Sequence, residues 1–248
     1  MSWDAYSRYY DWELEMLFPQ QNQDIEFWQQ FAQNYGEPIL EIGCGSGRVT
    51  LPLVQSGFQI TALDFSEKML AILRQKAKNS SNLELVQADM RNFNLEKRFA
   101  SAFISYFSLQ QLLSVSDMLA CLQTIHKHLK NGAKLGLDIM PCVCEGPDKM
   151  ELSPLYSAPF QGKTVTMYSS YQIDRLHQIK HWQDKYYEVS ETGRTVLENK
   201  VSLKECPPDL MELLLEKAGF RLVEKYGGFQ QQEITTDSQN ILYIAQKI

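Results

Sequence analysis

The sequence predicts an α/β fold in which a mostly parallel sheet is covered by helices on both faces. Between residues 38 and 140, short apolar runs typical of buried strands alternate with amphipathic segments of helical spacing. Strands that alternate with helices form parallel units with right-handed crossovers. A glycine-rich loop follows the first of these strands. The 248 residues, 44% hydrophobic and 22% charged, are enough for one large globular domain or two small ones.

Five apolar runs are the predicted strands, and capping residues mark the helices between them. The runs span residues 38–43, 58–64, 83–89, 101–107 and 133–140. The first helix is expected over 47–56 and the second after Ser66, whose hydroxyl can cap it. A third helix is expected from Ser116 to the Asn131-Gly132 pair, which is a typical helix stop.

The segments that flank this unit have different patterns. The N-terminus is rich in aromatic residues, and residues 23–35 have the spacing of an amphipathic helix. After the fifth strand, four prolines within residues 141–160 predict a loop, and alternating residues over 162–203 predict β-hairpins. The chain then returns to a helix and two strands, over 207–220, 221–229 and 240–248.

Charge and cysteine content exclude several classes of protein. A net charge of -6 and a pI near 5.3 argue against a nucleic-acid partner that needs a broad basic surface. No stretch reaches the roughly 20 apolar residues that span a bilayer, and the N-terminus lacks the pattern of a secretory signal. Cys142 and Cys144 have no histidine beside them to complete a zinc set. We therefore expect a cytoplasmic protein with reduced thiols, no membrane partner and no metal.

The glycine-rich loop is the most informative motif. Gly43, Gly45 and Gly47 stand between a predicted strand and a predicted helix, where glycine lets a ligand approach the main chain. Asp64 ends the next strand, where a carboxylate can accept the ribose hydroxyls of an adenosine. A dinucleotide loop reads G-x-G-x-x-G, whereas here the third glycine comes one residue early and Arg48 follows it. This spacing disfavours a nicotinamide dehydrogenase.

A third strand ends in Ala88-Asp89-Met90, where a carboxylate can accept a hydrogen bond from the adenine amine. The segments LEIGCGSGRVT, ALDFSEKML and QADMRNF occur in this order at ordinary spacing. Together they resemble class I S-adenosylmethionine-dependent methyltransferases. The resemblance covers residues 36–140 and extends to 204–248 as the expected last helix and strand pair.

The resemblance implies a Rossmann-like fold of seven strands in the order 3-2-1-4-5-7-6, with the last strand antiparallel. It divides the chain into an N-terminal helical lid (1–35), a cofactor-binding core (36–140 with 204–248) and a β-rich acceptor-binding insertion (141–203). The ADMRNF segment and the insertion, with the N-terminal Tyr10-Asp11, are also similar to small-molecule enzymes. Amino-sugar N,N-dimethyltransferases and related type 11 and type 25 methyltransferases are among these.

The resemblance also implies a set of cofactor contacts. Asp64 would hold the ribose hydroxyls, Phe65 would flank the adenine, and Asp89 would bind its amine. Tyr106 would lie near the methionine amine and the reacting sulfonium, and Tyr10 would close the N-terminal segment over the cofactor. The full expected set is Glu41, Gly43, Cys44, Gly45, Gly47, Asp64, Phe65, Met69, Asp89, Met90, Tyr106 and Tyr10.

Other residues are candidates for the acceptor side. His177 and His181 have the same parity, so on one strand they would share a face, and His181 could act as a base beside the catalytic candidates Tyr106 and Tyr10. The alternative for the histidines is a solvated strand face. The remaining candidates for substrate contact are Tyr6, Gln110, Gln111 and His177.

The predicted activity is transfer of a methyl group from S-adenosylmethionine to nitrogen or oxygen of a small molecule, with S-adenosylhomocysteine as the product. The alternatives are a protein or RNA acceptor, and a non-catalytic cofactor-binding protein. Lys and Arg in the insertion alternate with acids, so no basic stripe forms. Ser105-Tyr106-Phe107-Ser108 stands where base and glutamine methylators carry an Asn-Pro-Pro-Tyr-like tetrapeptide. Both a monomer and a homodimer fit the sequence.

Overall fold

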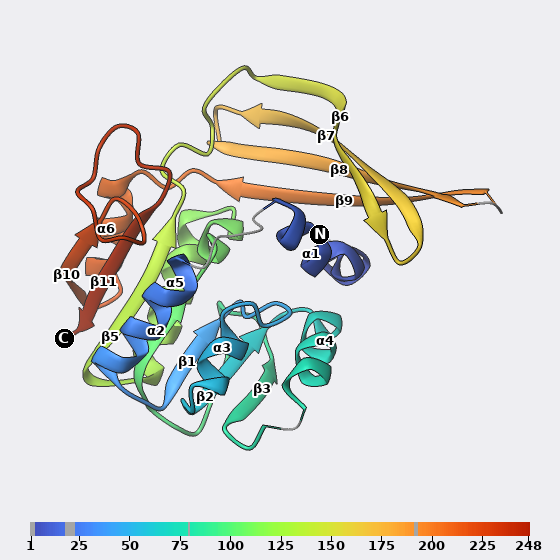
Figure 1. Cartoon of the computed structure of the whole chain (residues 1–248). Coiled ribbons are helices and arrows are strands. Elements are labelled where there is room, and N and C mark those ends of the chain that lie inside the picture. The colour runs from blue at the N-terminus through green and yellow to red at the C-terminus, as the bar shows by residue number, and fades with distance from the viewer. Residues whose placement is uncertain (1–2, 18–22, 79, 191–192) are drawn as a thin grey trace. The chain divides into compact units, whose positions relative to one another are not determined.

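The computed structural model describes residues 3–17, 23–78, 80–190 and 193–248 (Figure 1). They form two compact units. The first combines Met1–Pro19 with Val143–Glu205, and the second combines Gln20–Cys142 with Cys206–Ile248. The N-terminal region expected as one helical lid therefore contributes to both units, because its first helix belongs to the first unit and its second helix to the second.

The second unit, which we call the core unit, contains a seven-stranded sheet. Its order is β10-β11-β5-β4-β1-β2-β3, and β11 is antiparallel to both of its neighbours. The strands are β1 (Ile39–Ile42), β2 (Ile60–Asp64), β3 (Leu83–Gln87), β4 (Phe99–Ile104), β5 (Leu129–Ile139), β10 (Phe220–Tyr226) and β11 (Ile241–Lys247). This order is the predicted 3-2-1-4-5-7-6. The strand order reverses at β1, which pairs with β2 and β4, so the carboxyl ends of these strands border the crevice where such sheets bind ligands.

Helices cover both faces of this sheet, as the sequence predicts. They are α2 (Gln23–Tyr35), α3 (Thr50–Gln55), α4 (Glu67–Ala77), η1 (Ser108–Gln111), α5 (Val115–His128) and α6 (Pro208–Lys217). Successive residues of a strand point to opposite faces, and Ile39 and Leu40 of β1 belong to different buried clusters. One cluster contains Trp28 of α2, and the other contains Met118 of α5 and Met211 of α6.

The ends of two helices test the capping predictions. Ser66 caps α4, since its hydroxyl accepts a hydrogen bond from the Met69 amide at 3.3 Å. The predicted cap at Ser116 is wrong, because Ser114 accepts the bond from the Asp117 amide at 3.0 Å. The predicted stop at Asn131-Gly132 is also wrong, because α5 ends at His128 and this pair lies in an irregular part of β5. Gly132 has a φ of 78°, a backbone conformation that glycine adopts readily and that occurs at this irregularity of the strand.

The first unit, which we call the hairpin unit, is a helix and a four-stranded antiparallel sheet in the order β6-β7-β8-β9. Its elements are α1 (Trp3–Leu17), β6 (Lys149–Phe160), β7 (Lys163–Asp174), β8 (Ile179–Ser190) and β9 (Gly193–Lys204). The hairpins are as predicted, but β6 replaces most of the expected loop. Pro154 and Pro159 are tolerated there because β6 pairs only with β7, and an edge strand can lose amide donors.

Candidate active site

The glycine loop lies between β1 and α3, at the carboxyl end of the central strand. Gly43, Gly45 and Gly47 all have positive φ, at 72°, 54° and 90°. A Cβ at position 43 would lie 2.9 Å from the Ser108 Oγ, and one at position 47 would lie 2.2 Å from a Leu73 methyl carbon. Both the backbone conformation and the available space therefore require glycine at positions 43 and 47.

Asp64 joins this loop to the end of β2. Its Oδ2 accepts a hydrogen bond from the Gly45 amide, and its Oδ1 accepts one from the Ser66 amide, both at 2.8 Å. Each carboxylate oxygen has a second lone pair, so two hydroxyl groups can still bind. Burial raises the pKa of Asp64, and the two amides oppose that rise. The adjacent Phe65 has 70% of its surface exposed, which leaves its ring accessible to a flat apolar group.

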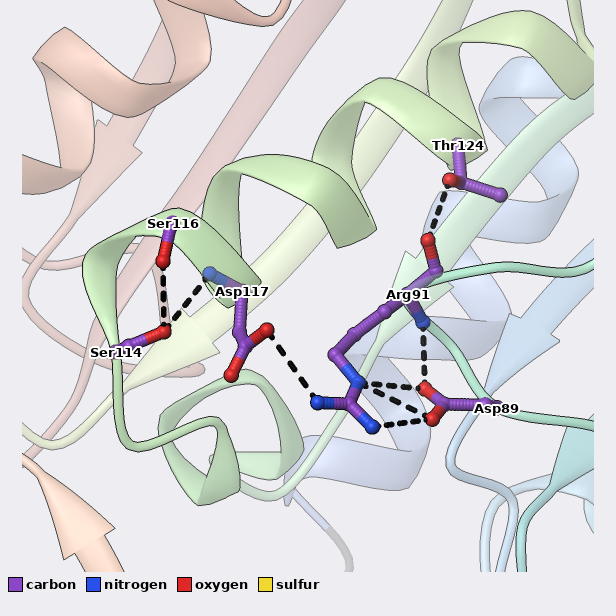
Figure 2. Close-up of polar contacts among 6 residues, drawn as sticks. All are labelled: Asp89, Arg91, Ser114, Ser116, Asp117 and Thr124. Carbon is purple, nitrogen blue, oxygen red and sulfur yellow. Dashed lines mark hydrogen bonds and ion pairs between the residues drawn. The ribbon is translucent and has the colours of Figure 1, made fainter.

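Asp89 follows β3 and is held by Arg91 (Figure 2). The Arg91 guanidinium donates to both oxygens of Asp89, at 2.6 to 3.1 Å, and its backbone amide donates to Oδ1 at 2.9 Å. Arg91 also pairs with Asp117 at 3.3 Å, and Thr124 donates to the Arg91 carbonyl at 2.8 Å. Arg91 thus fastens Asp89 to α5. The hydrogen bonds from Arg91 lower the pKa of Asp89, so this carboxyl is ionised at neutral pH.

Glu41 lies in β1, and its side chain is buried. Its Oε2 has no hydrogen-bond partner among the described residues. Burial raises its pKa to about 8, and the charge of Arg48 opposes this rise. A carboxylate oxygen of this kind fits a ligand that carries positive charge, because a cation favours the ionised form.

Asp138 is a buried carboxyl that the sequence reasoning missed. It lies next to the last residue of β5, and its Oδ1 accepts a hydrogen bond from the Tyr106 amide at 2.9 Å. Tyr106 follows β4 directly after Ser105, and its ring lies under the Arg48 guanidinium, 5.1 Å from the carbon. The signal was an acid inside the apolar run of the fifth strand, near its carboxyl end.

The remaining core-unit candidates are more enclosed. Both polar atoms of the Gln110 side-chain amide form hydrogen bonds with the Met140 backbone, at 2.8 and 3.0 Å. These bonds connect η1 to the segment that follows β5. Met69 and Cys44 are buried, and burial raises the pKa of the Cys44 thiol. Met90 packs against the main buried cluster, and Gln111 ends η1 with a partly exposed side chain. Their expected contacts with ligands stay predictions.

Two tyrosine candidates belong to α1 of the hairpin unit. Tyr6 donates its hydroxyl to the buried Glu13, and its ring meets that of Tyr10 edge-on at 5.7 Å. Glu13 also accepts hydrogen bonds from Tyr156 at 2.6 Å and from Tyr186 at 2.8 Å. This carboxylate with three tyrosine hydroxyls is a second polar cluster, located inside the hairpin unit.

The two histidine candidates also lie in the hairpin unit, but not on one strand. His177 is in the turn between β7 and β8 and pairs with Asp174 at 2.7 Å. His181 is in β8, and its Nδ1 lies 2.8 Å from the Ser202 hydroxyl. The expectation that they share a strand face is therefore wrong, because His177 lies in the hairpin turn and only His181 lies in a strand.

The sheet order, the glycine loop and the acids at the strand ends agree with the class I S-adenosylmethionine-dependent methyltransferases that the sequence resembles. Residues 39–132 match the family model for a methyltransferase domain. No group of three or more potential metal ligands occurs in the part of the chain that the structure describes. None of the helices described here is long and apolar enough to cross a membrane.

Known proteins resemble the chain over its whole length. A putative methyltransferase of Geobacillus sp. is 24% identical over 258 aligned positions, which cover 100% of both chains. The structure of an S-adenosylmethionine-dependent methyltransferase from Clostridium acetobutylicum has a TM-score of 0.81 at 15% identity and covers 98% of each chain. The sugar N-methyltransferase KedS8 from Streptoalloteichus sp. has a TM-score of 0.77 at 17% identity, over 95% of this chain and 92% of that one. These structural likenesses establish the fold.

Proposed function

We propose that this chain transfers the methyl group of S-adenosylmethionine to a nitrogen or oxygen atom of a small molecule by in-line displacement. The observation that carries the proposal is the geometry of Asp64, which the Gly45 and Ser66 amides hold at the carboxyl end of β2. When bound, the cofactor supplies a methyl group on a sulfonium sulfur, and this sulfur is the leaving group, as a neutral thioether. The protein then needs no nucleophile of its own and must align the acceptor and exclude water.

We assign the cofactor contacts as the sequence predicts them. Asp64 accepts the ribose hydroxyls through its remaining lone pairs, Phe65 stacks on the adenine, and Asp89 accepts the adenine amine. Glu41 orders the loop and balances the positive charge of the methionine part. Each of these roles is supported by position, since all four residues lie within two residues of the carboxyl end of β1, β2 or β3.

We infer that the hairpin unit, built on residues 143–205 and α1, selects the acceptor, and that the acceptor is an amine. The buried acids support this inference, because carboxylates that meet aromatic rings favour a cationic or amine-bearing ligand. Glu13 is surrounded by tyrosine hydroxyls, and burial raises the pKa of Asp184 to about 6. The fold shared with a sugar N-methyltransferase is a second support.

A protonated amine has to lose a proton before its nitrogen can attack the methyl group, after which the nitrogen–carbon bond forms as the sulfur–carbon bond breaks. His181 is our candidate to take that proton, because its ring is oriented by the Ser202 hydroxyl. Tyr10 and Tyr106 are candidates to line the path of the methyl group. An acceptor that arrives as a neutral amine would need no base, and its transfer rate would then survive a His181→Ala substitution.

Two measurements test the proposed function. Calorimetry should detect binding of S-adenosylhomocysteine and none of NAD, and the reverse result would contradict the cofactor assignment. Methyl-labelled S-adenosylmethionine, incubated with the protein and a cell extract, should label the small-metabolite fraction. Label in protein or RNA alone would replace the small acceptor with a macromolecule. Binding without any transfer would leave a cofactor-binding protein.

A further inference from the structure

Asp138 is placed so that it controls the turn after β4. Its neighbour Leu137 pairs with Ile104, the last residue of β4, so Asp138 lies level with the start of that turn. Its surface is fully buried, at 0% exposure. The Oδ1 holds the Tyr106 amide at 2.9 Å, whereas the Oδ2 has no hydrogen-bond partner among the residues that the structure describes.

The turn that Asp138 holds has an unusual backbone. Tyr106 and Phe107 are consecutive non-glycine residues with φ of 57° and 59°. Residues other than glycine rarely adopt this left-handed region, and two in succession persist only where the surrounding structure fixes them. The Tyr106 and Phe107 amides both face Asp138 and oppose the effect of burial on its pKa. The carboxylate therefore holds the turn from the side of β5, together with the hydrogen bonds that the Ser108 amide and hydroxyl donate to the Ser105 carbonyl at 3.3 and 2.8 Å.

The charges that face Asp138 are Asp24 from α2 and Arg48 from the glycine loop. Arg48 pairs with Asp24 at 2.5 Å, and its charge also acts on Glu41. The single positive charge of Arg48 therefore acts on three buried carboxyl groups, those of Asp24, Glu41 and Asp138. Buried acids that outnumber their cations favour a ligand that brings positive charge of its own.

We propose that Asp138 is a positioning residue for the methionine end of the cofactor. Asp138 acts through the Tyr106–Phe107 turn, because its carboxylate accepts a hydrogen bond from the Tyr106 amide. The inference rests on the proposed function, because it assumes that S-adenosylmethionine lies at the carboxyl edge of β1 and β4. The charge of Asp138 strengthens the bond to the Tyr106 amide. It also adds to the negative potential toward the cofactor's ammonium group.

Two ligands separate this role from a purely structural one. S-adenosylhomocysteine carries the amino-acid end of the cofactor, whereas 5′-methylthioadenosine has the same adenosine part without it. Asp138→Asn keeps the size and removes the charge, so we expect S-adenosylhomocysteine to bind about tenfold more weakly. We expect 5′-methylthioadenosine to bind within about twofold of wild type. An equal loss for both ligands, or no loss for either, would overturn the inference.

Ser101→Ala is the matched control. Ser101 is also a fully buried polar residue of this sheet, and its hydroxyl donates to the Gly36 carbonyl at 2.7 Å near the amino end of β4. The Ser101→Ala variant should change the affinities for S-adenosylhomocysteine and 5′-methylthioadenosine by the same factor. A wild-type protein that binds neither ligand would refute the proposed function and this inference together. A protein that binds both, with no separation in the variant, would refute only the role of Asp138.

A pH series keeps the inference testable if the Asp138→Asn variant does not fold. Burial raises the pKa of Asp138 to about 7 and that of Glu41 to about 8. As the pH is lowered from 7.5 to 5.5, Asp138 takes up a proton, and the wild-type affinity for S-adenosylhomocysteine should fall roughly tenfold. The affinity for 5′-methylthioadenosine should stay nearly constant over the same range. Glu41→Gln, measured alongside, removes the part of the fall that belongs to Glu41. A flat profile in Glu41→Gln would overturn the role of Asp138.

Discussion

Replacing Asp64 with alanine should weaken cofactor binding far more than it weakens the fold. In the native protein the carboxylate accepts two backbone amides at 2.8 Å, and in the proposed complex it also accepts two ribose hydroxyls. Hydrogen bonds to a charged group contribute about 1.5–3 kcal/mol each, and they do not add fully because the hydroxyls regain water in the variant. A loss of about 2–3 kcal/mol, or roughly 30- to 150-fold in affinity for S-adenosylhomocysteine, follows.

The effect on stability should be smaller because two contributions oppose each other. The Gly45 and Ser66 amides lose their acceptor, which costs about 1–2 kcal/mol where water can partly replace it. Burial raises the pKa of Asp64, so its removal also relieves the desolvation of a charge. We therefore expect a fall of about 1 kcal/mol in the free energy of unfolding, measured by urea titration.

Calorimetry with S-adenosylhomocysteine measures the affinity, and Glu67→Ala is the control. Glu67 is near Asp64 in sequence, but its side chain is 54% exposed, and its ion pair within the described residues is with Arg74, at 3.5 Å. This control should bind like wild type. An Asp64→Ala protein that is folded and binds within about twofold of wild type would refute the assignment of the ribose to this carboxylate.

Three further predictions concern the loop, the Asp89 carboxylate and pH. Gly47→Ala should lower the free energy of unfolding by about 2–4 kcal/mol in urea titration, because its Cβ would overlap Leu73 at 2.2 Å and φ is 90°. Arg91→Gln should weaken binding of S-adenosylhomocysteine severalfold in calorimetry, because Asp89 loses the guanidinium that holds its carboxylate in place, and slightly more at pH 5 than at pH 8, because that guanidinium also lowers the pKa of Asp89. The ligand-free protein should melt at a higher temperature at pH 7 than at pH 8. Glu41, with its pKa raised to about 8, binds more protons when folded than unfolded, and Glu41→Gln should reduce that difference.

The sequence predicted the fold of the core unit well because its signals are local. The apolar runs, the glycine loop and the Ser66 cap each depend on neighbours along the chain, and the strand order followed from the resemblance. The errors at Ser116 and Asn131-Gly132 displace the ends of one helix by a few residues, whereas the larger errors occur where a distant partner decides the structure. Pro154 and Pro159 do not prevent a strand, because β6 lies at the edge of its sheet, and strand position is not visible in sequence.

The hairpin unit illustrates the same limit for the candidate site. Parity placed His177 and His181 on one face, but parity has no meaning across a turn, and the turn at residues 175–178 carries no Asn-Gly or Asp-Gly pair. Glu13 was not singled out, because two of its three tyrosine partners come from strands more than 140 residues away in the chain. A carboxylate cluster assembled from distant segments has no spacing that sequence reasoning could recognise.

Asp138 could have been found, because the acids of the core unit follow a simple rule. Glu41, Asp64, Asp89 and Asp138 each lie within two residues of the carboxyl end of β1, β2, β3 or β5. Carboxyl ends of parallel strands meet at one edge of a sheet, so these acids gather on one side of the fold. Only β4, among the five successive strands, ends without an acid. Its turn at Tyr106 instead uses the acid of its neighbour, β5. A search for the first acid at the end of every apolar run would therefore have identified both the edge where we propose that the cofactor binds and the carboxylate that bonds to the Tyr106 amide.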